Sequence, residues 1–202
     1  MFKTLADESA LLLISHKIID EENREAYTYG LELFFEKAFL YAIIFIIAIL
    51  TKTLLFSIVF IVTYKALRQY TGGFHCKTAE MCLVISVLIY LIALLIFLVK
   101  PQLFEFILAI STIISTIIIL IFSPIENANR PLDITEKKKY RIISIAITSV
   151  IAMVVALSYN MGFHAIFYSF SFSLTADAVM IILSLGGNKC EKDDSEGFGK
   201  SS

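Results

Sequence analysis

The segment EMCLVISVLIYLIALLIFLV, residues 80–99, decides the fold class of this chain. Its length matches the ~20 apolar residues that an α-helix needs to cross a bilayer. The whole chain agrees, because 58% of its residues are hydrophobic and only 17% are charged, whereas about a quarter are charged in soluble domains. Lipid leaves no partner for unpaired backbone groups. We therefore expect an all-α, polytopic integral membrane protein.

Similar apolar runs on either side predict a six-helix transmembrane bundle. The six predicted spans are residues 31–50, 53–67, 80–99, 102–122, 140–157 and 163–185. The second is short, covering ~22 Å at 1.5 Å per residue, so it either crosses with little tilt, thins the bilayer or re-enters. We expect residues 1–185 to form a single membrane-embedded domain, followed by a charged cytoplasmic tail, residues 186–202.

The first thirty residues predict an amphipathic helix that lies along the membrane surface. Leu11, Ile14 and Ile18 recur at helical spacing, and polar residues take the other face. The acidic residues of this segment, and the lack of a cleavage site, argue against a signal peptide.

The distribution of basic residues predicts the orientation. With the N-terminus inside, fifteen of the seventeen Lys and Arg residues lie on the cytoplasmic side, and only Lys52 and Lys100 lie outside. The positive-inside rule favours this topology, provided that the number of spans is even and that the second span crosses. Both termini and the segment between the second and third spans are then cytoplasmic.

That cytoplasmic segment, RQYTGGFHCKTAEMC, contains His75 and Cys82, a pair that can serve as general base and thiolate nucleophile. On one continuous helix they would lie ~10 Å apart along the axis. The chain must therefore fold back to join them, and the pair Gly72 and Gly73 is where it can do so. If the third span begins near Thr78, Cys82 lies one turn into a helix, where the helix dipole favours the thiolate.

Other interpretations of these residues stay open. The plain one is a basic loop with a surface histidine and two cysteines at the membrane edge. Cys76 is a second candidate thiol, but side chains at adjacent positions point apart, so His75 would serve it poorly. His75, Cys76, Cys82 and Cys190 could supply four metal ligands, although no paired spacing supports this. We expect no metal and no cofactor, and reduced cysteines.

Several polar residues remain to be placed. Asp177 lies deep in the last span, where a carboxylate is costly and marks a functional or paired group. It could orient His75 or meet Lys189, and Glu80 and Glu126 compete for the role of a third catalytic residue. Arg68 could bind a substrate carboxylate or lipid phosphate. A small polar stripe suits helix packing or a dimer contact; it consists of Ser111, Thr112, Ser115 and Thr116.

The stretch LRQYTGGFHCKTAEMC resembles the signature of the accessory gene regulator B (AgrB) family, bacterial membrane cysteine peptidases that process quorum-sensing peptide precursors. The matching residues are Arg68, Gly72, Gly73, His75 and Cys82. A second stretch, SPIENANRPLDITEKKKYR, is similar to the family's Pro, Asn, Pro-Leu and Glu-Lys segment. Cys76 departs from the pattern, since a small residue such as Ala is expected there.

The resemblance implies a fold, an activity and a set of partners. The chain would sit in the bacterial cell membrane as a homodimer and cut the C-terminal tail from an AgrD-like precursor peptide on the cytoplasmic side. Cys82 would hold the peptide as a thioester with His75 as the proton carrier, and a thiolactone or lactone ring would then close. No nucleic acid is implied. The rival interpretations are a small transporter or peptide exporter, with Asp177 as a coupling site, and a non-enzymatic scaffold.

Overall fold

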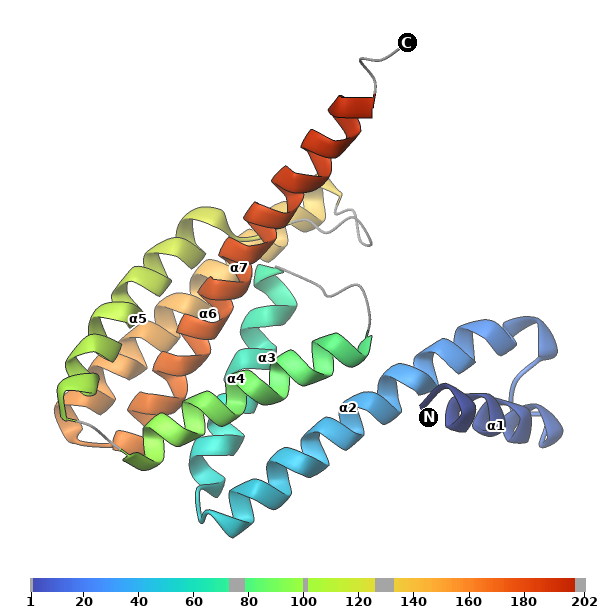
Figure 1. Ribbon diagram of the computed structural model, residues 1–202, viewed down its shortest axis with the longest axis horizontal. Coiled ribbons are helices and arrows are strands. Elements are labelled where there is room, and N and C mark those ends of the chain that lie inside the picture. The colour runs from blue at the N-terminus through green and yellow to red at the C-terminus, as the bar shows by residue number, and fades with distance from the viewer. Residues whose placement is uncertain (1, 73–78, 100–101, 126–132, 199–202) are drawn as a thin grey trace. The chain divides into compact units, whose positions relative to one another are not determined.

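The computed structural model is all-helical over the residues that it describes, namely 2–72, 79–99, 102–125 and 133–198; for 79–80, 82–83, 102 and 187–198 it describes the backbone only. In chain order the elements are α1 (Phe2–Ser15), the 3-10 turn η1 (Glu21–Asn23), α2 (Arg24–Leu50), α3 (Leu54–Thr71), α4 (Ala79–Val99), α5 (Gln102–Phe122), α6 (Ile134–Met161) and α7 (His164–Phe198) (Figure 1). No strand occurs in these ranges, so the predicted all-α class is confirmed.

Helices α2 to α7 cover the six predicted apolar runs with different ends, while the number of six membrane spans stays a prediction. Four of the described helical segments are long and apolar enough to cross a membrane, at Glu21–Leu50, Leu103–Phe122, Ile134–Met161 and His164–Gly186. A shorter apolar helix covers Val84–Val99. α3 runs to Thr71, four residues beyond the predicted second span, and α7 continues past its apolar part to Phe198.

The chain divides into two compact units, of which the first comprises residues 1–52 and 76–90. Here α1 packs on α2, with Ala6 and Ala10 fully buried and the rings of Phe2 and Phe39 5.5 Å apart. The amphipathic helix predicted over residues 1–30 is divided into α1 and the start of α2. Lys17 has a φ of +55°, a left-handed conformation that does not continue an α-helix.

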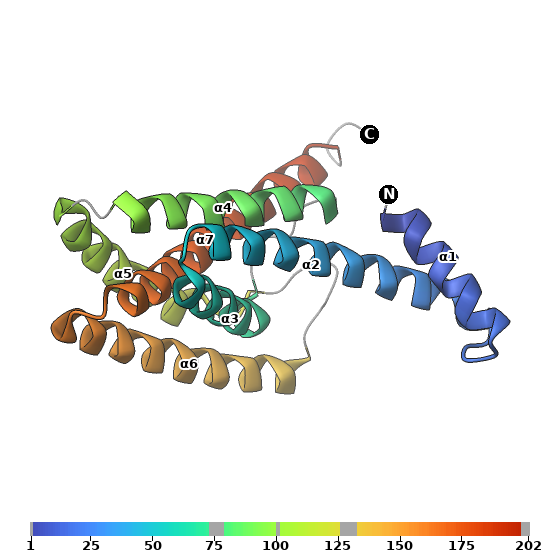
Figure 2. The same ribbon diagram turned by 90° about the horizontal axis from the view of Figure 1, so that it is seen from below.

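The second unit comprises residues 53–75 and 91–202, and α7 is its central helix. α7 packs against α3, α5 and α6, and α5 and α6 pack against each other (Figures 1 and 2). Aromatic rings tie the end of α4 into this unit: Phe97 stacks on Phe56 at 4.5 Å and meets Tyr168 edge-on at 5.6 Å. Phe97 of α4 therefore contacts both α3 and α7.

Three serine and aspartate side chains on one face of α7 point at α3. Ser169 Oγ donates to the carbonyl oxygen of Phe56, and Ser173 Oγ, one turn later, donates to that of Phe60. Asp177, another turn on, meets Thr71. Because the partner numbers rise together on both helices, α3 and α7 run parallel.

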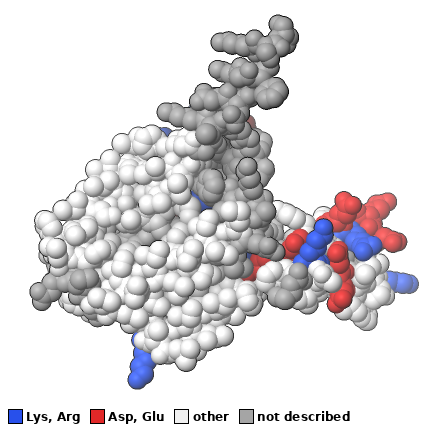
Figure 3. Space-filling model, in the orientation of Figure 1, with Lys and Arg blue, Asp and Glu red and all other residues white. Residues whose placement is uncertain are grey.

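The outer surface of the helices is apolar. Large side chains such as Leu50 and Leu103 are 77% and 75% exposed. On the face shown in Figure 3, Lys, Arg, Asp and Glu are almost absent from the helices of the second unit. They gather on the N-terminal arm of the first unit, which consists of α1, η1 and the start of α2, residues 2–30. Exposed apolar surface of this extent is expected where lipid replaces water.

Candidate active site

In the sequence, the predicted catalytic residues follow the end of α3 and continue into the start of α4. His75, Gly73 and the second thiol, Cys76, are outside the described residues. Cys82 lies in the first turn of α4, which begins at Ala79, as the sequence led us to expect. Of the predicted site residues, Arg68 and Gly72 are those whose side chains or full geometry are described.

Gly72 ends α3 in a conformation that requires glycine. Its φ is +74° and its ψ is −144°, a combination that L side chains avoid. The Ile125 N–H donates to the carbonyl oxygen of Thr71 at 2.9 Å, and Gly72 forms an isolated bridge with Ile125. A Cβ on Gly72 would overlap the carbonyl oxygen of Ile125. Residues 71–72, which precede the predicted catalytic residue His75, are therefore held against the chain that follows α5.

Arg68 reinforces this turn from within α3. Its Nη1 donates to the carbonyl oxygen of Gly72 at 2.6 Å, and the side chain is partly buried. The guanidinium satisfies a carbonyl at the C-terminal end of the helix, where a positive charge is favourable. The described position gives Arg68 a structural contact, and its binding of a substrate carboxylate stays a prediction.

Asp177 is the buried acid of the second unit. Its side chain is 0% exposed, and Oδ1 accepts a hydrogen bond from Thr71 Oγ1 at 3.0 Å. Arg68 is close enough for an electrostatic interaction with it. The sequence predicts His75 or Lys189 as the partner of Asp177, whereas the partner in the structure is Thr71. The feature of the sequence that could have identified Thr71 is its position immediately before the glycine pair.

The other candidates for a third catalytic role are not described. The side chain of Glu80 and all of Glu126 lie outside the described residues, as do the side chains of Cys82 and Cys190 in the proposed metal set. Within the described part of the chain, no three His, Cys, Asp or Glu side chains lie close enough to hold a metal ion.

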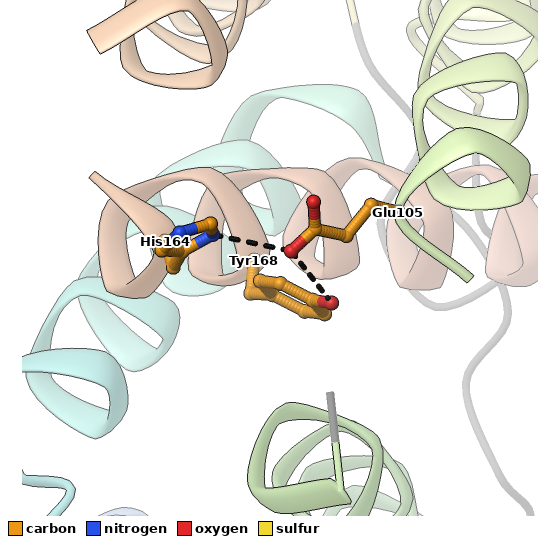
Figure 4. A network of polar contacts seen from close by, with 3 residues as sticks. All are labelled: Glu105, His164 and Tyr168. Carbon is orange, nitrogen blue, oxygen red and sulfur yellow. Dashed lines mark hydrogen bonds and ion pairs between the residues drawn. The ribbon is translucent and has the colours of Figure 1, made fainter. Parts of the chain in front are cut away.

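A polar cluster that the sequence analysis missed lies at the opposite end of the second unit (Figure 4). Glu105 Oε1 lies 3.1 Å from His164 Nδ1 and accepts a hydrogen bond from Tyr168 Oη at 3.4 Å. The cluster joins the start of α5 to the start of α7 and borders a cavity of about 370 Å³. The feature of the sequence that could have indicated this cluster is Glu105 itself, a charged residue in an apolar run four residues after Pro101.

The polar stripe on α5 packs against α7, as one of the two predictions for it proposed. Ser111 Oγ and Thr175 Oγ1 are hydrogen-bonded at 3.2 Å, and Ser115 is buried. The hydroxyls of Thr112 and Thr116 donate hydrogen bonds to backbone carbonyl oxygens one turn earlier on α5. The stripe is thus a helix contact within the chain, and its use in a dimer is untested.

Comparison with known proteins covers nearly the whole chain. Residues 6–184 match the family Accessory gene regulator B. A putative AgrB-like protein of Clostridium perfringens (strain SM101) is 29% identical over 178 residues, 79% of this chain and 82% of the relative. The accessory gene regulator protein B of Staphylococcus carnosus is 28% identical over 127 residues, 62% of this chain and 65% of that protein. No solved structure matches.

Proposed function

Because this chain belongs to the accessory gene regulator B family, we propose that it is a membrane cysteine endopeptidase acting in quorum sensing. Its substrate would be a short AgrD-like precursor peptide, from which it removes the C-terminal tail at the cytoplasmic face of the bacterial cell membrane. The observation that carries the proposal is the position of Cys82 in the first turn of α4, directly after the segment containing His75.

The proposed reaction uses Cys82 as nucleophile and His75 as proton carrier. The positive end of the α4 dipole favours the Cys82 thiolate. The thiolate attacks the scissile carbonyl, the C–N bond breaks, and His75 delivers a proton to the amine of the departing tail. The remaining peptide is then held as a thioester on Cys82.

The thioester explains how one enzyme can both cut and cyclise. A thioester keeps acyl energy that hydrolysis would discard, so a cysteine or serine of the bound peptide can displace Cys82 and close a thiolactone or lactone ring. Water must be kept away until that step, and a site at the bilayer edge suits this requirement.

The start of α6 supports recognition of an acidic leaving tail. Lys138, Lys139 and Arg141 are exposed in its first turns. By the predicted topology this end of α6 lies on the cytoplasmic side, the same side as Cys82. We propose that these charges attract the precursor's tail, and that the working unit is a homodimer.

Co-expression with the short peptide encoded beside this gene tests the proposal. Mass spectrometry should find a shortened peptide with the wild-type chain. The full-length peptide alone should remain with Cys82→Ala and with His75→Ala. Hydroxylamine should release the peptide from trapped wild-type enzyme, because it cleaves thioesters.

The matched control is Cys76→Ala, which removes the neighbouring thiol and should leave processing intact. Normal processing by Cys82→Ala together with its loss in Cys76→Ala would show that the nucleophile is misassigned. Export or uptake of an unmodified peptide by both the wild-type chain and Cys82→Ala would favour the transporter interpretation.

A further inference from the structure

Asp177 is a buried carboxylate in the apolar part of α7. The Asp177 side chain is fully buried, and a charged group inside the membrane is costly unless it is paired or used. Oδ1 has Thr71 as its hydrogen-bond donor, whereas Oδ2 has no hydrogen-bond partner among the described residues. The reaction proposed for His75 and Cys82 assigns no role to Asp177.

The contacts of Asp177 lead to the start of the catalytic segment. Thr71 is the last residue of α3, and its hydroxyl carries the proton that Asp177 accepts. The hydroxyl also lies 3.0 Å from the carbonyl oxygen of Leu67, but it has one proton, and a carboxylate is the stronger acceptor. Asp177 on α7 therefore fixes the C-terminal end of α3.

Arg68 connects the same carboxylate to Gly72. The guanidinium donates to the Gly72 carbonyl oxygen at 2.6 Å and interacts electrostatically with Asp177. Asp177, through Thr71, and Arg68, through Gly72, thus hold two consecutive residues at the end of α3. With the bond from Ile125 N–H to the Thr71 carbonyl, three separate parts of the chain hold residues 71–72, three residues before His75.

We propose that Asp177 is a positioning residue for catalysis: through Thr71 and Arg68 it fixes residues 71–72, the backbone from which the segment containing His75 continues. The inference rests on the proposed function, since it assigns Asp177 a task only if His75 and Cys82 form the reacting pair. A displacement of about 1 Å at a reacting group can lower a rate by about 100-fold, so the anchoring is expected to act on kcat.

The test uses the full-length protein in lipid nanodiscs, in a background where Cys76→Ser and Cys190→Ser leave Cys82 as the single thiol. The informative variants are Thr71→Val, which keeps the shape and removes the hydroxyl, and Asp177→Asn, which removes the charge. Thr71→Ser restores the hydroxyl. Ser173→Ala is the matched control, because it removes a buried hydrogen bond between the same two helices, one turn away.

Two readouts separate positioning from general stability. The first is the pH profile of Cys82 alkylation by iodoacetamide, which reports the thiolate and its imidazole partner. Its midpoint should rise in Thr71→Val and Asp177→Asn, as in His75→Ala, and should stay at the wild-type value in Ser173→Ala and Thr71→Ser. The second is precursor cleavage, where kcat should fall by about 10- to 100-fold in the two informative variants with KM within about threefold of wild type.

The possible outcomes distinguish a failure of the proposed function from a failure of the positioning role alone. If His75→Ala leaves the alkylation midpoint unchanged, the thiolate–imidazole pair, and with it the proposed function, is wrong. If His75→Ala shifts the midpoint but Thr71→Val and Asp177→Asn behave like Ser173→Ala, only the positioning role of Asp177 is wrong. Should Asp177→Asn not fold, the Thr71→Val and Thr71→Ser pair decides by itself.

Discussion

Gly72 shows how much of the site depends on one residue type. Its backbone conformation and its close approach to Ile125 are two separate requirements, and both exclude a side chain. Gly162, which ends α6, also has a positive φ, of +73°, but a Cβ there would meet nothing within 4 Å. Substitutions at the two glycines therefore distinguish conformational strain, which both positions have, from steric overlap, which only Gly72 has.

Replacing each glycine by alanine should give different losses of stability. Gly162→Ala should cost about 1–2 kcal/mol, the cost of a left-handed residue with a side chain. Gly72→Ala should cost more than about 3 kcal/mol, because overlap with the Ile125 carbonyl adds to backbone strain of ~1–3 kcal/mol. Unfolding in mixed micelles titrated with SDS measures both, and equal losses would contradict the close approach at Gly72.

At the residue scale the sequence predicts a chemistry, but it does not predict the contacts that hold the residues in place. The short spacing of His75, Cys82 and the glycine pair marks a reactive segment, because these residue types are rare in an apolar chain. The link between Thr71 and Asp177 spans 106 positions. No local periodicity encodes which residue of α3 a carboxylate on α7 will meet, since that depends on how the helices pack.

At the scale of elements, the Glu105 cluster joins α5 to α7 at the end of the second unit opposite Thr71. Glu105 is 28% exposed and His164 52% exposed, so their contact is screened by solvent and its contribution is small. The bond to Tyr168, whose side chain is fully buried, is better protected. The cluster is therefore expected to act mainly as a helix–helix contact.

Glu105→Ala should destabilise the second unit by about 1–2 kcal/mol, because it leaves the buried Tyr168 hydroxyl without an acceptor. Glu105→Gln keeps an acceptor and should recover most of that loss. SDS-induced unfolding is again the measurement, with precursor cleavage expected to stay near the wild-type rate in both variants. Full stability in Glu105→Ala would mean that Tyr168 does not depend on this carboxylate.

The basic residues at the start of α6 are expected to raise the affinity for the precursor peptide. Reversing Lys138 and Lys139 to Glu should raise KM for an acidic-tailed precursor by about five- to tenfold, because exposed ion pairs contribute ~0.2–1 kcal/mol each. The difference should shrink at high salt. Lys3→Glu with Lys17→Glu is the control, since it changes the same charge on the N-terminal arm. An unchanged KM with both pairs would leave α6 with a membrane-anchoring role.

The helical elements were predictable because apolar runs and their polar breaks are local signals. The exceptions have local causes as well. The N-terminal arm divides near Lys17, where one left-handed residue interrupts a pattern that periodicity alone carries through to residue 30. α3 extends to Thr71 because Arg68 and Thr71 have partners in the folded chain, whereas hydropathy alone ends the span at Leu67.

At the scale of the whole molecule, the question is whether α3 crosses the membrane. It is not among the four segments that qualify by length and composition. Yet its 18 residues extend ~27 Å, close to the ~30 Å hydrocarbon thickness. It also runs parallel to α7, with Phe56 and Phe60 bonded to successive turns of that long apolar helix. We therefore expect α3 to cross the membrane alongside α7.

If α3 crosses, Lys52 and Lys100 both lie outside and the segment with His75 lies inside. Lys52→Cys and Lys100→Cys, each in a background without native cysteines, should then react with a membrane-impermeant maleimide on intact cells. Lys17→Cys should react only after permeabilisation. Labelling of Lys52→Cys but not of Lys100→Cys would mean that α3 re-enters instead of crossing. The proposed reaction would then face the exterior, where a cytoplasmic precursor could not reach Cys82.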